Sequence, residues 1–188
     1  ARKQTEASTQ QAQRLAKRGF IDIKARRVDR NPLEGWTFPR QIPFEPTEAQ
    51  QAAVHAISQS LENPVVGKPR RFLVHGVTGS GKTEVYLRSL EKAIQLGKKG
   101  IVLVPEISLT PQTIDRFGAR LAGNVAVLHS QLSIGQQFDE WWRIKGGNAP
   151  VVIGSRSAIF APQDDLGIII IDEEHDGSFK QQDMGPRY

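Results

Sequence analysis

Cysteine is absent from this 188-residue sequence, and methionine occurs only once. Without thiols the chain holds no disulfide and no thiolate metal site, a composition that suits a reducing cytoplasm. No apolar run approaches the roughly 20 residues that a membrane-spanning helix needs, and no apolar segment follows the polar N-terminus as in a signal peptide. We therefore expect a cytoplasmic chain without membrane contact. Because it begins with Ala1 and not with methionine, we also expect a piece of a longer protein.

Positive charge is concentrated near the N-terminus. Residues 1–30 contain nine Lys or Arg and three Asp or Glu, which gives a net charge of +6. The remaining residues carry 16 basic and 17 acidic side chains, a net charge of −1. A compact basic segment is typical of nucleic-acid contact, but a solvated helix face has the same composition. Charge alone leaves both interpretations open.

The basic segment carries a weak structural pattern. Residues 11–17 favour a helix that Gly19 ends, and residues 20–23 alternate between apolar and polar side chains like a strand. A short helix, a glycine and a basic strand resemble the last part of a winged-helix module. We assign residues 1–31 to the C-terminal part of such a module.

Residues 32–46 contain four prolines, which predicts an extended linker. Three aromatic side chains within it, Trp36, Phe38 and Phe44, are more apolar than a free linker needs. We therefore expect the linker to lie against a surface.

From residue 47 onward, apolar runs alternate with segments of helix length. Strands are predicted over residues 72–74, 101–104, 125–128, 151–153 and 167–171, and helices after Thr47 and over residues 82–96, 111–121 and 135–144. Unbroken apolar runs are typical of strands buried on both faces of a sheet. Helical crossovers between them favour parallel pairing. The predicted fold class is α/β, with a mainly parallel sheet and helices on both faces.

A glycine-rich loop follows the first of these predicted strands. It matches the pattern G-x-x-x-x-G-K-[ST] at every fixed position and consists of Gly76, Val77, Thr78, Gly79, Ser80, Gly81, Lys82 and Thr83. Such glycines let backbone N–H groups converge on phosphate oxygens, Lys82 supplies a charge to the β- and γ-phosphates, and Thr83 offers a hydroxyl to Mg²⁺. The alternative is a chance Gly/Ser loop, which the flanking strand and helix disfavour. The loop predicts binding of a nucleoside triphosphate.

Four ionisable residues follow the last predicted strand: Asp172, Glu173, Glu174 and His175. Strands of a parallel sheet bind ligands at their carboxyl ends, so Asp172 is placed to hold Mg²⁺ beside Thr83, through a coordinated water. Glu173 is then placed to orient or deprotonate an attacking water. A solvated acidic turn is the alternative. A second acid beside the metal ligand favours hydrolysis of ATP over passive nucleotide binding.

Two further side chains have more than one interpretation. The amide of Gln50 is able to read the edge of adenine, but it also completes a capping box with Thr47, and the sequence leaves both roles open. His175 is predicted to couple the phosphate site to a polymer track. A metal-ligand role is the alternative, which the spacing of the other histidines does not favour.

These motifs resemble those of the superfamily 2 helicases, and residues 47–188 are similar to the replication-restart DNA helicase family within them. The resemblance rests on the phosphate loop, the acidic residues, residues 104–112 (motif Ia), residues 154–160 (motif Ib) and residues 179–183. It implies a RecA-like P-loop NTPase lobe, the first of two motor lobes. The implied activity is that of an ATP-dependent 3′→5′ DNA helicase, which acts at stalled forks in replication restart and primosome assembly.

The same resemblance implies site residues and partners. Gln50 would contact adenine, and the phosphate loop with Asp172 would hold ATP and Mg²⁺. The implied DNA contacts are Pro105, Thr110, Arg156, Ser157, Phe179 and Lys180, with Tyr188 near the same aromatic-rich loop. For Arg156, a salt-bridged surface role is the alternative. Implied partners are single-stranded and forked DNA and the primosome and replication-restart proteins, for a monomer in the bacterial cytoplasm associated with the nucleoid.

The sequence also departs from that family. A second motor lobe with its arginine finger, a zinc module and an N-terminal DNA-binding domain are expected outside these 188 residues, so zinc is expected only there. We therefore expect the isolated chain to bind Mg-nucleotide but to hydrolyse it poorly and not to unwind DNA. Two alternative functions remain: the motor lobe of another superfamily 2 DNA translocase, which residues 180–182 disfavour, and a non-hydrolysing nucleotide switch or adaptor, which Glu173 disfavours.

Overall fold

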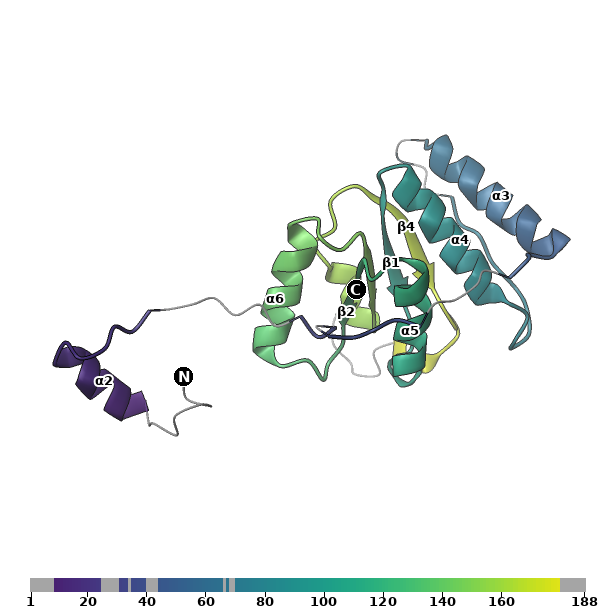
Figure 1. Ribbon diagram of the computed structural model, residues 1–188. Coiled ribbons are helices and arrows are strands. Elements are labelled where there is room, and N and C mark those ends of the chain that lie inside the picture. The colour runs from purple at the N-terminus through teal and green to yellow at the C-terminus, as the bar shows by residue number, and fades with distance from the viewer. Residues whose placement is uncertain are drawn as a thin grey trace, which may run out of the picture.

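A computed structural model of the protein describes residues 9–24, 31–33, 35–39, 44–65, 67 and 70–179. Among these residues four strands form one sheet in the order β2-β3-β1-β4, and every neighbouring pair is parallel (Figure 1). The strands are β1 (Lys99–Leu103), β2 (Val125–Leu128), β3 (Val151–Gly154) and β4 (Leu166–Ile171). The predicted α/β class with a mainly parallel sheet is confirmed.

Helices cover both faces of the sheet. They are α4 (Lys82–Gln95), α5 (Pro111–Arg120) and α6 (Ile134–Lys145), while α3 (Glu48–Glu62) packs on the outer side of α4 (Figure 1). Val102 of β1 points into the core with α4 and α5, whereas its neighbour Ile101 points into the core with Ile144 of α6. Successive residues of a strand face opposite sides, so an unbroken apolar run is required to fill both cores.

Two helices begin at complete capping boxes. Thr47 accepts a hydrogen bond from the backbone of Gln50, whose side chain accepts one from the backbone of Thr47, at the start of α3. Ser133 and Gln136 repeat this arrangement at the start of α6. Each box satisfies backbone N–H groups that have no partner within the helix. The predicted start of α3 is confirmed.

The segment that precedes α4 differs from its prediction. Residues 72–74 are predicted to form a strand, but residues 70–77 are irregular and do not join the sheet. Leu73 is 81% exposed. Among the described residues, β4 pairs only with β1 and forms the edge of the sheet, and residues 70–77 do not pair with its free edge. An apolar run becomes a strand only where a neighbouring strand accepts its backbone hydrogen bonds.

The described residues of the N-terminal segment include the helix α2 (Thr9–Lys17), and Gly19, two residues after its end, has a φ of 76°. The strand predicted over residues 20–23 is not formed, and no residue from 10 to 24 is buried. Arg26 and Arg27 lie outside the described residues. The assignment of residues 1–31 to a winged-helix module stays a prediction.

The proline-rich segment is packed onto the lobe along its described residues. Leu33 is buried in the core beside α5, and Phe38 packs against the same core. The indole Nε1 of Trp36 donates to Oδ1 of Asp115 over 2.6 Å. A side chain at Gly118 would overlap the ring of Phe38, so this glycine is required for the close approach. We call residues 32–46 the strap; the expectation that it lies against a surface is confirmed for its described residues.

Candidate nucleotide-binding site

The phosphate loop, residues 76–83, owes its shape to its glycines. Gly79 and Gly81 have φ values of 82° and 83°, in the left-handed region that favours glycine. A Cβ at Gly76 would lie 2.5 Å from Oγ of Ser80. Gly81 also forms the N-cap of α4, so the loop leads directly into the positive end of a helix. This is the local geometry expected of a phosphate cradle.

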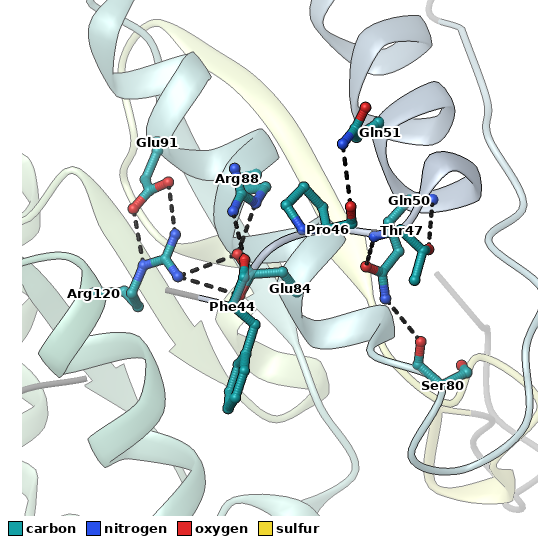
Figure 2. Close-up of polar contacts among 10 residues, drawn as sticks. All are labelled: Phe44, Pro46, Thr47, Gln50, Gln51, Ser80, Glu84, Arg88, Glu91 and Arg120. Carbon is teal, nitrogen blue, oxygen red and sulfur yellow. Dashed lines mark hydrogen bonds and ion pairs between the residues drawn. The ribbon is translucent and has the colours of Figure 1, made fainter. Parts of the chain in front are cut away.

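Two polar side chains brace the loop from within and from outside. Nζ of Lys82 donates to the carbonyl oxygens of Gly76 at 2.9 Å and of Val77 at 3.3 Å, so the ammonium group lies inside the loop. Nε2 of Gln50 donates to the carbonyl oxygen of Ser80 at 2.9 Å (Figure 2). The side chain of Gln50 therefore serves the helix cap through Oε1 and the phosphate loop through Nε2 at the same time. Gln50 joins α3 to the loop, a contact that the sequence did not predict.

The two predicted metal ligands lie on neighbouring elements. Thr83 is in the first turn of α4, and Asp172 directly follows β4, where its N–H donates to the carbonyl of Leu103 at the end of β1. The hydroxyl of Tyr86, on α4, donates to Oδ1 of Asp172 over 3.2 Å. The N–H of Glu173 donates to the same oxygen, also over 3.2 Å. The carboxylate is thereby tied to the helix that carries the phosphate loop.

Tyr86 is a part of the site that the sequence motifs do not predict. Burial of its hydroxyl, and then the charge and hydrogen bond of Asp172, raise the pKa of Tyr86 far above its ordinary value. The phenol therefore stays protonated and donates. Its position four residues after Lys82, on the face of α4 toward the sheet, is the only signal in the sequence that could have indicated this role.

Glu173 occupies a strained position. Its φ is 48°, a conformation that non-glycine residues adopt rarely and that clusters at functional sites. Its Oε2 lies 3.6 Å from Nε2 of His175, and both side chains are accessible to solvent. The structure thus brings the predicted water-activating acid and the predicted coupling histidine into contact.

The residues present fit a magnesium-bound triphosphate. Hard divalent cations prefer oxygen ligands, and the predicted donors are a hydroxyl at Thr83 and a carboxylate at Asp172 whose orientation is held by two hydrogen bonds. The loop beside them is built from glycines at positive φ. Within the described part of the chain, no group of three or more His, Asp or Glu residues forms a separate all-protein metal site. Magnesium bound together with phosphates suits this donor set better than an all-protein cage.

The predicted DNA contacts lie at the carboxyl edge of the same sheet. Arg156 and Ser157 begin the short 3₁₀ helix Arg156–Phe160 after β3, and both are exposed. Thr110 follows β1 and is the N-cap of α5, where its hydroxyl accepts a hydrogen bond from the N–H of Thr113. The structure therefore gathers Thr110, Arg156 and Ser157 at the edge where Asp172 lies.

The other three predicted DNA contacts are Pro105, Phe179 and Lys180, and neither Pro105 nor Phe179 is an exposed residue. The ring of Pro105 is fully buried, so its side chain is not presented to a ligand. Phe179 is partly buried and packs against the core on the α6 side of the sheet, so its role as a DNA contact stays a prediction. Both are apolar residues next to the sheet, and burial of their surface outweighs exposure. Lys180 and Tyr188 lie outside the described residues.

Comparison with known proteins agrees with this geometry. The family model described as DEAD/DEAH box helicase matches residues 47–187. The chain belongs to the DEAD/DEAH box helicase family. This membership accounts for the parallel sheet with the phosphate loop before α4 and the acidic residues after β4, and the predicted RecA-like lobe is confirmed.

Relatives of this helicase domain match it over most of its length. Over 186 residues it is 47% identical to replication restart protein PriA of Bacillus subtilis, and over 190 residues 45% identical to the protein of that name from Chlamydia muridarum. These matches cover 99% of this chain but only 23% and 24% of the relatives. The Haemophilus influenzae protein is 53% identical over 112 residues, 60% of this chain and 15% of its own length. The predicted resemblance to replication-restart helicases is confirmed.

None of the helices in the described ranges is both long and apolar enough to cross a membrane.

Proposed function

We propose that this chain is the ATP- and DNA-binding first motor lobe of an ATP-dependent 3′→5′ DNA helicase. The observation that carries the proposal is the Tyr86–Asp172 hydrogen bond, because it connects the helix of the phosphate loop to the carboxyl edge where the predicted DNA contacts lie. The relatives are named as replication restart proteins. We therefore propose action at stalled forks in replication restart and primosome assembly, on single-stranded and forked DNA and with the primosome proteins as partners.

The nucleotide is ATP in this proposal. Backbone N–H groups of the loop and Lys82 bind the phosphates, and Gln50 contacts adenine after its amide leaves Ser80. Thr83 and Asp172 would hold Mg²⁺, which would supply positive charge to the phosphates. Glu173 orients the attacking water and accepts its proton on a carboxylate oxygen. His175, which lies against Glu173, transmits the state of this carboxylate toward the DNA.

The DNA path in this proposal crosses the carboxyl edge of the sheet. Thr110 and Ser157 offer hydroxyl groups to phosphates, and Arg156 offers a positive charge, as sugar–phosphate contacts require. The N-terminal basic segment supplies further cations, and Lys180 extends the path beyond the described residues. Contacts of this kind bind DNA without reading its sequence.

The remaining arrangement follows the family resemblance. Residues 47–188 form the ATP-binding lobe, the strap connects it to a winged-helix module that ends at residue 31, and a second lobe outside the chain supplies an arginine finger. Because such a finger contributes about 10³–10⁵-fold in rate, the isolated chain would bind Mg-nucleotide but hydrolyse it slowly. Zinc would belong only to the second-lobe region. The full protein would act as a monomer in the bacterial cytoplasm, at the nucleoid.

Substitution of Glu173 tests the hydrolytic assignment in the full-length protein. Glu173→Gln is expected to lower the DNA-stimulated ATPase rate by about 100-fold or more while ATP still binds, because only the proton acceptor is lost. Glu174→Gln, which changes the adjacent exposed acid, is the matched control and should stay close to wild type. If Glu173→Gln kept its ATPase activity, the non-hydrolysing switch would be the better assignment.

Polarity is tested separately with partial duplexes that carry either a 3′ or a 5′ single-stranded tail. The proposal expects ATP-dependent strand separation only when the tail on the loading strand allows 3′→5′ movement. Separation with the opposite polarity would favour another superfamily 2 translocase.

A further inference from the structure

Four charged side chains form a compact cluster between α4 and α5 (Figure 2). The cluster consists of Glu84, Arg88 and Glu91 on α4 and Arg120 at the end of α5. The side chain of Arg120 is 7% exposed and that of Glu84 is 12% exposed. Two cations and two anions balance one another, so the cluster is electrically neutral. We call it the charge junction.

Arg120 is the centre of the charge junction. Its Nε and Nη2 donate to the two carboxylate oxygens of Glu91 at 3.1 and 3.0 Å, a two-pronged contact that fits the fork of a guanidinium. Its Nη1 donates to both oxygens of Glu84 at 3.2 Å. One side chain of α5 therefore holds two carboxylates that lie two turns apart on α4.

Electrostatics favour the charged form of this arginine despite its burial. Burial alone would lower the pKa of Arg120, but the hydrogen bonds and charges of Glu91 and then Glu84 raise it above its ordinary value. Buried charged pairs of this kind are costly to break, since each partner loses its compensation. The relative position of α4 and α5 is thus specified by directional contacts in addition to apolar packing.

The two helices begin at different parts of the proposed site. Glu84 is the residue after Thr83, within the first turn of α4 that closes the phosphate loop. At the other end of α5, Thr110 forms the N-cap among the proposed DNA contacts. Ten helical residues span about 15 Å as a stiff rod, so a shift of the DNA end of α5 is carried to Arg120.

The strap also reaches the charge junction. Nε of Arg88 donates to Oε1 of Glu84 at 2.7 Å, and its Nη2 donates to the carbonyl oxygen of Phe44 at 2.9 Å. Glu84 consequently accepts hydrogen bonds from Arg88 and Arg120 together. Through Arg88, the strap is therefore connected to the carboxylate of Glu84 (Figure 2).

We propose that Arg120 is a positioning residue that couples DNA binding at the start of α5 to the phosphate loop at the start of α4. The inference rests on the proposed function, because coupling has meaning only if DNA stimulates the ATPase. Arg120 touches neither nucleotide nor DNA in this proposal. It fixes the position of the first turn of α4 relative to α5. A DNA strand bound beside Thr110 therefore changes the conformation of the phosphate loop.

The test measures the ATPase rate of the full-length protein with and without single-stranded DNA, for wild type and for Arg120→Met. The DNA-stimulated rate divided by the DNA-free rate is expected to be about tenfold lower in Arg120→Met than in wild type. A tenfold change corresponds to a free energy within the range measured for interactions between contacting residues. The DNA-free rate and the DNA concentration for half-maximal stimulation should change by no more than about twofold, because the binding groups are intact. Lys92→Met is the matched control: it removes a 2.5 Å ion pair of α4 with Glu62 of α3, not with α5, and should keep the ratio.

A double-mutant cycle separates coupling from simple loss of packing. Glu91→Gln alone should lower the ratio, and adding it to Arg120→Met should cause little further loss, because both remove the same contact. Where Arg120→Met does not fold, Arg120→Lys keeps the charge without the two-pronged geometry and should also lower the ratio.

Three outcomes would overturn the inference. An unchanged ratio in Arg120→Met beside a wild type that responds to DNA would overturn the coupling role alone. Equal loss of the DNA-free and DNA-stimulated rates would show that Arg120 serves stability only. A wild type whose ATPase ignores DNA would overturn the proposed function, and the coupling role with it.

Discussion

The hydroxyl of Tyr86 donates a hydrogen bond to Oδ1 of Asp172 across 3.2 Å, from the helix after the phosphate loop to the end of β4. The two residues are 86 positions apart in the sequence. Their contact makes the orientation of the proposed magnesium ligand depend on the same helix that closes the phosphate loop. A group that orients a metal ligand commonly affects metal affinity by 10–100-fold.

Tyr86→Phe is expected to raise the magnesium concentration needed for half-maximal ATPase activity by about tenfold. The substitution keeps the buried ring and removes only the hydroxyl, so Asp172 loses one of its two restraints. A magnesium titration of the full-length protein at saturating ATP measures the effect. Ser89→Ala, which removes a buried hydroxyl without a partner from the same helix, should leave the titration unchanged. An equal magnesium requirement in Tyr86→Phe would contradict the role of the contact.

Gln50→Glu separates the two functions assigned to this side chain. The glutamate keeps an oxygen for the backbone of Thr47, so the capping box and the stability of α3 should persist to within about 0.5 kcal/mol. It loses the amide donor that contacts Ser80 and, in our proposal, adenine. The preference for ATP over GTP should therefore disappear in competition binding. Gln136→Glu in the matching box of α6 is the control and should keep the preference. A retained preference would leave Gln50 with a structural role only.

The strap is expected to contribute to the stability of the lobe. Phe38→Ala should lower the free energy of unfolding of the chain by about 2–3 kcal/mol, because its ring fills the space above Gly118. Gly118→Ala should lower the free energy of unfolding by about 1–3 kcal/mol, because the added methyl group overlaps that ring. Denaturant unfolding measures both.

The combination of the two changes gives the sharper result. In the double variant the alanine at 118 occupies space that the ring has left, so the combined loss should be smaller than the sum. Phe44→Ala, at a strap residue that is 82% exposed, is the control and should change the free energy by no more than about 0.5 kcal/mol. Additive losses would mean that Phe38 and Gly118 do not contact each other in solution.

A buried acid on α6 predicts a pH dependence of stability. Burial raises the pKa of Glu140 above its ordinary value of 4.5, and the two hydrogen bonds from Arg143 only partly offset it. An acid with a raised pKa in the folded state favours folding most when protonated, so this contribution is lost as the pH rises from 4.5 through the folded pKa. Glu140→Gln should remove this slope from the pH profile of unfolding.

Removal of Arg143, the partner of Glu140, should make the stability of the chain depend more strongly on pH. Arg143→Met leaves the buried carboxylate without its cation and should cost about 3–5 kcal/mol near neutral pH, with partial recovery as the pH falls. Lys145→Met, which breaks the exposed pair with Asp164, is the control and should cost less than about 1 kcal/mol. Equal losses for the two variants would contradict the importance of burial.

Much of the site was predictable because its signals are local. The pattern of residues 76–83 specifies glycines at positive φ, and the observed values at Gly79 and Gly81 agree. Apolar runs long enough to fill both faces of a sheet located β1 to β4 to within about two residues. Acidic residues after such a run must lie at the carboxyl edge of a parallel sheet. Each of these conclusions depends on neighbours in the sequence.

The predictions that were wrong concern partners that are distant in the sequence. Residues 72–74 have the composition of a strand, yet they do not pair with the outer edge of β4, the edge strand of the described sheet. Pro105 and Phe179 stay predicted DNA contacts, although the lobe buries the first and packs the partly buried ring of the second against its core. Composition does not reveal whether an apolar side chain near a sheet is buried in the core or exposed to a ligand.

The α/β class, the phosphate loop and the acids at the end of β4 follow from the sequence, because backbone conformation and hydrophobic periodicity are local properties. Three contacts are visible only in the folded chain: Tyr86 holds Asp172, Arg120 joins α4 to α5, and the strap packs onto α5. These contacts join residues 29 to 86 positions apart. Their existence depends on how the helices pack against the sheet, and packing is a property of the whole chain.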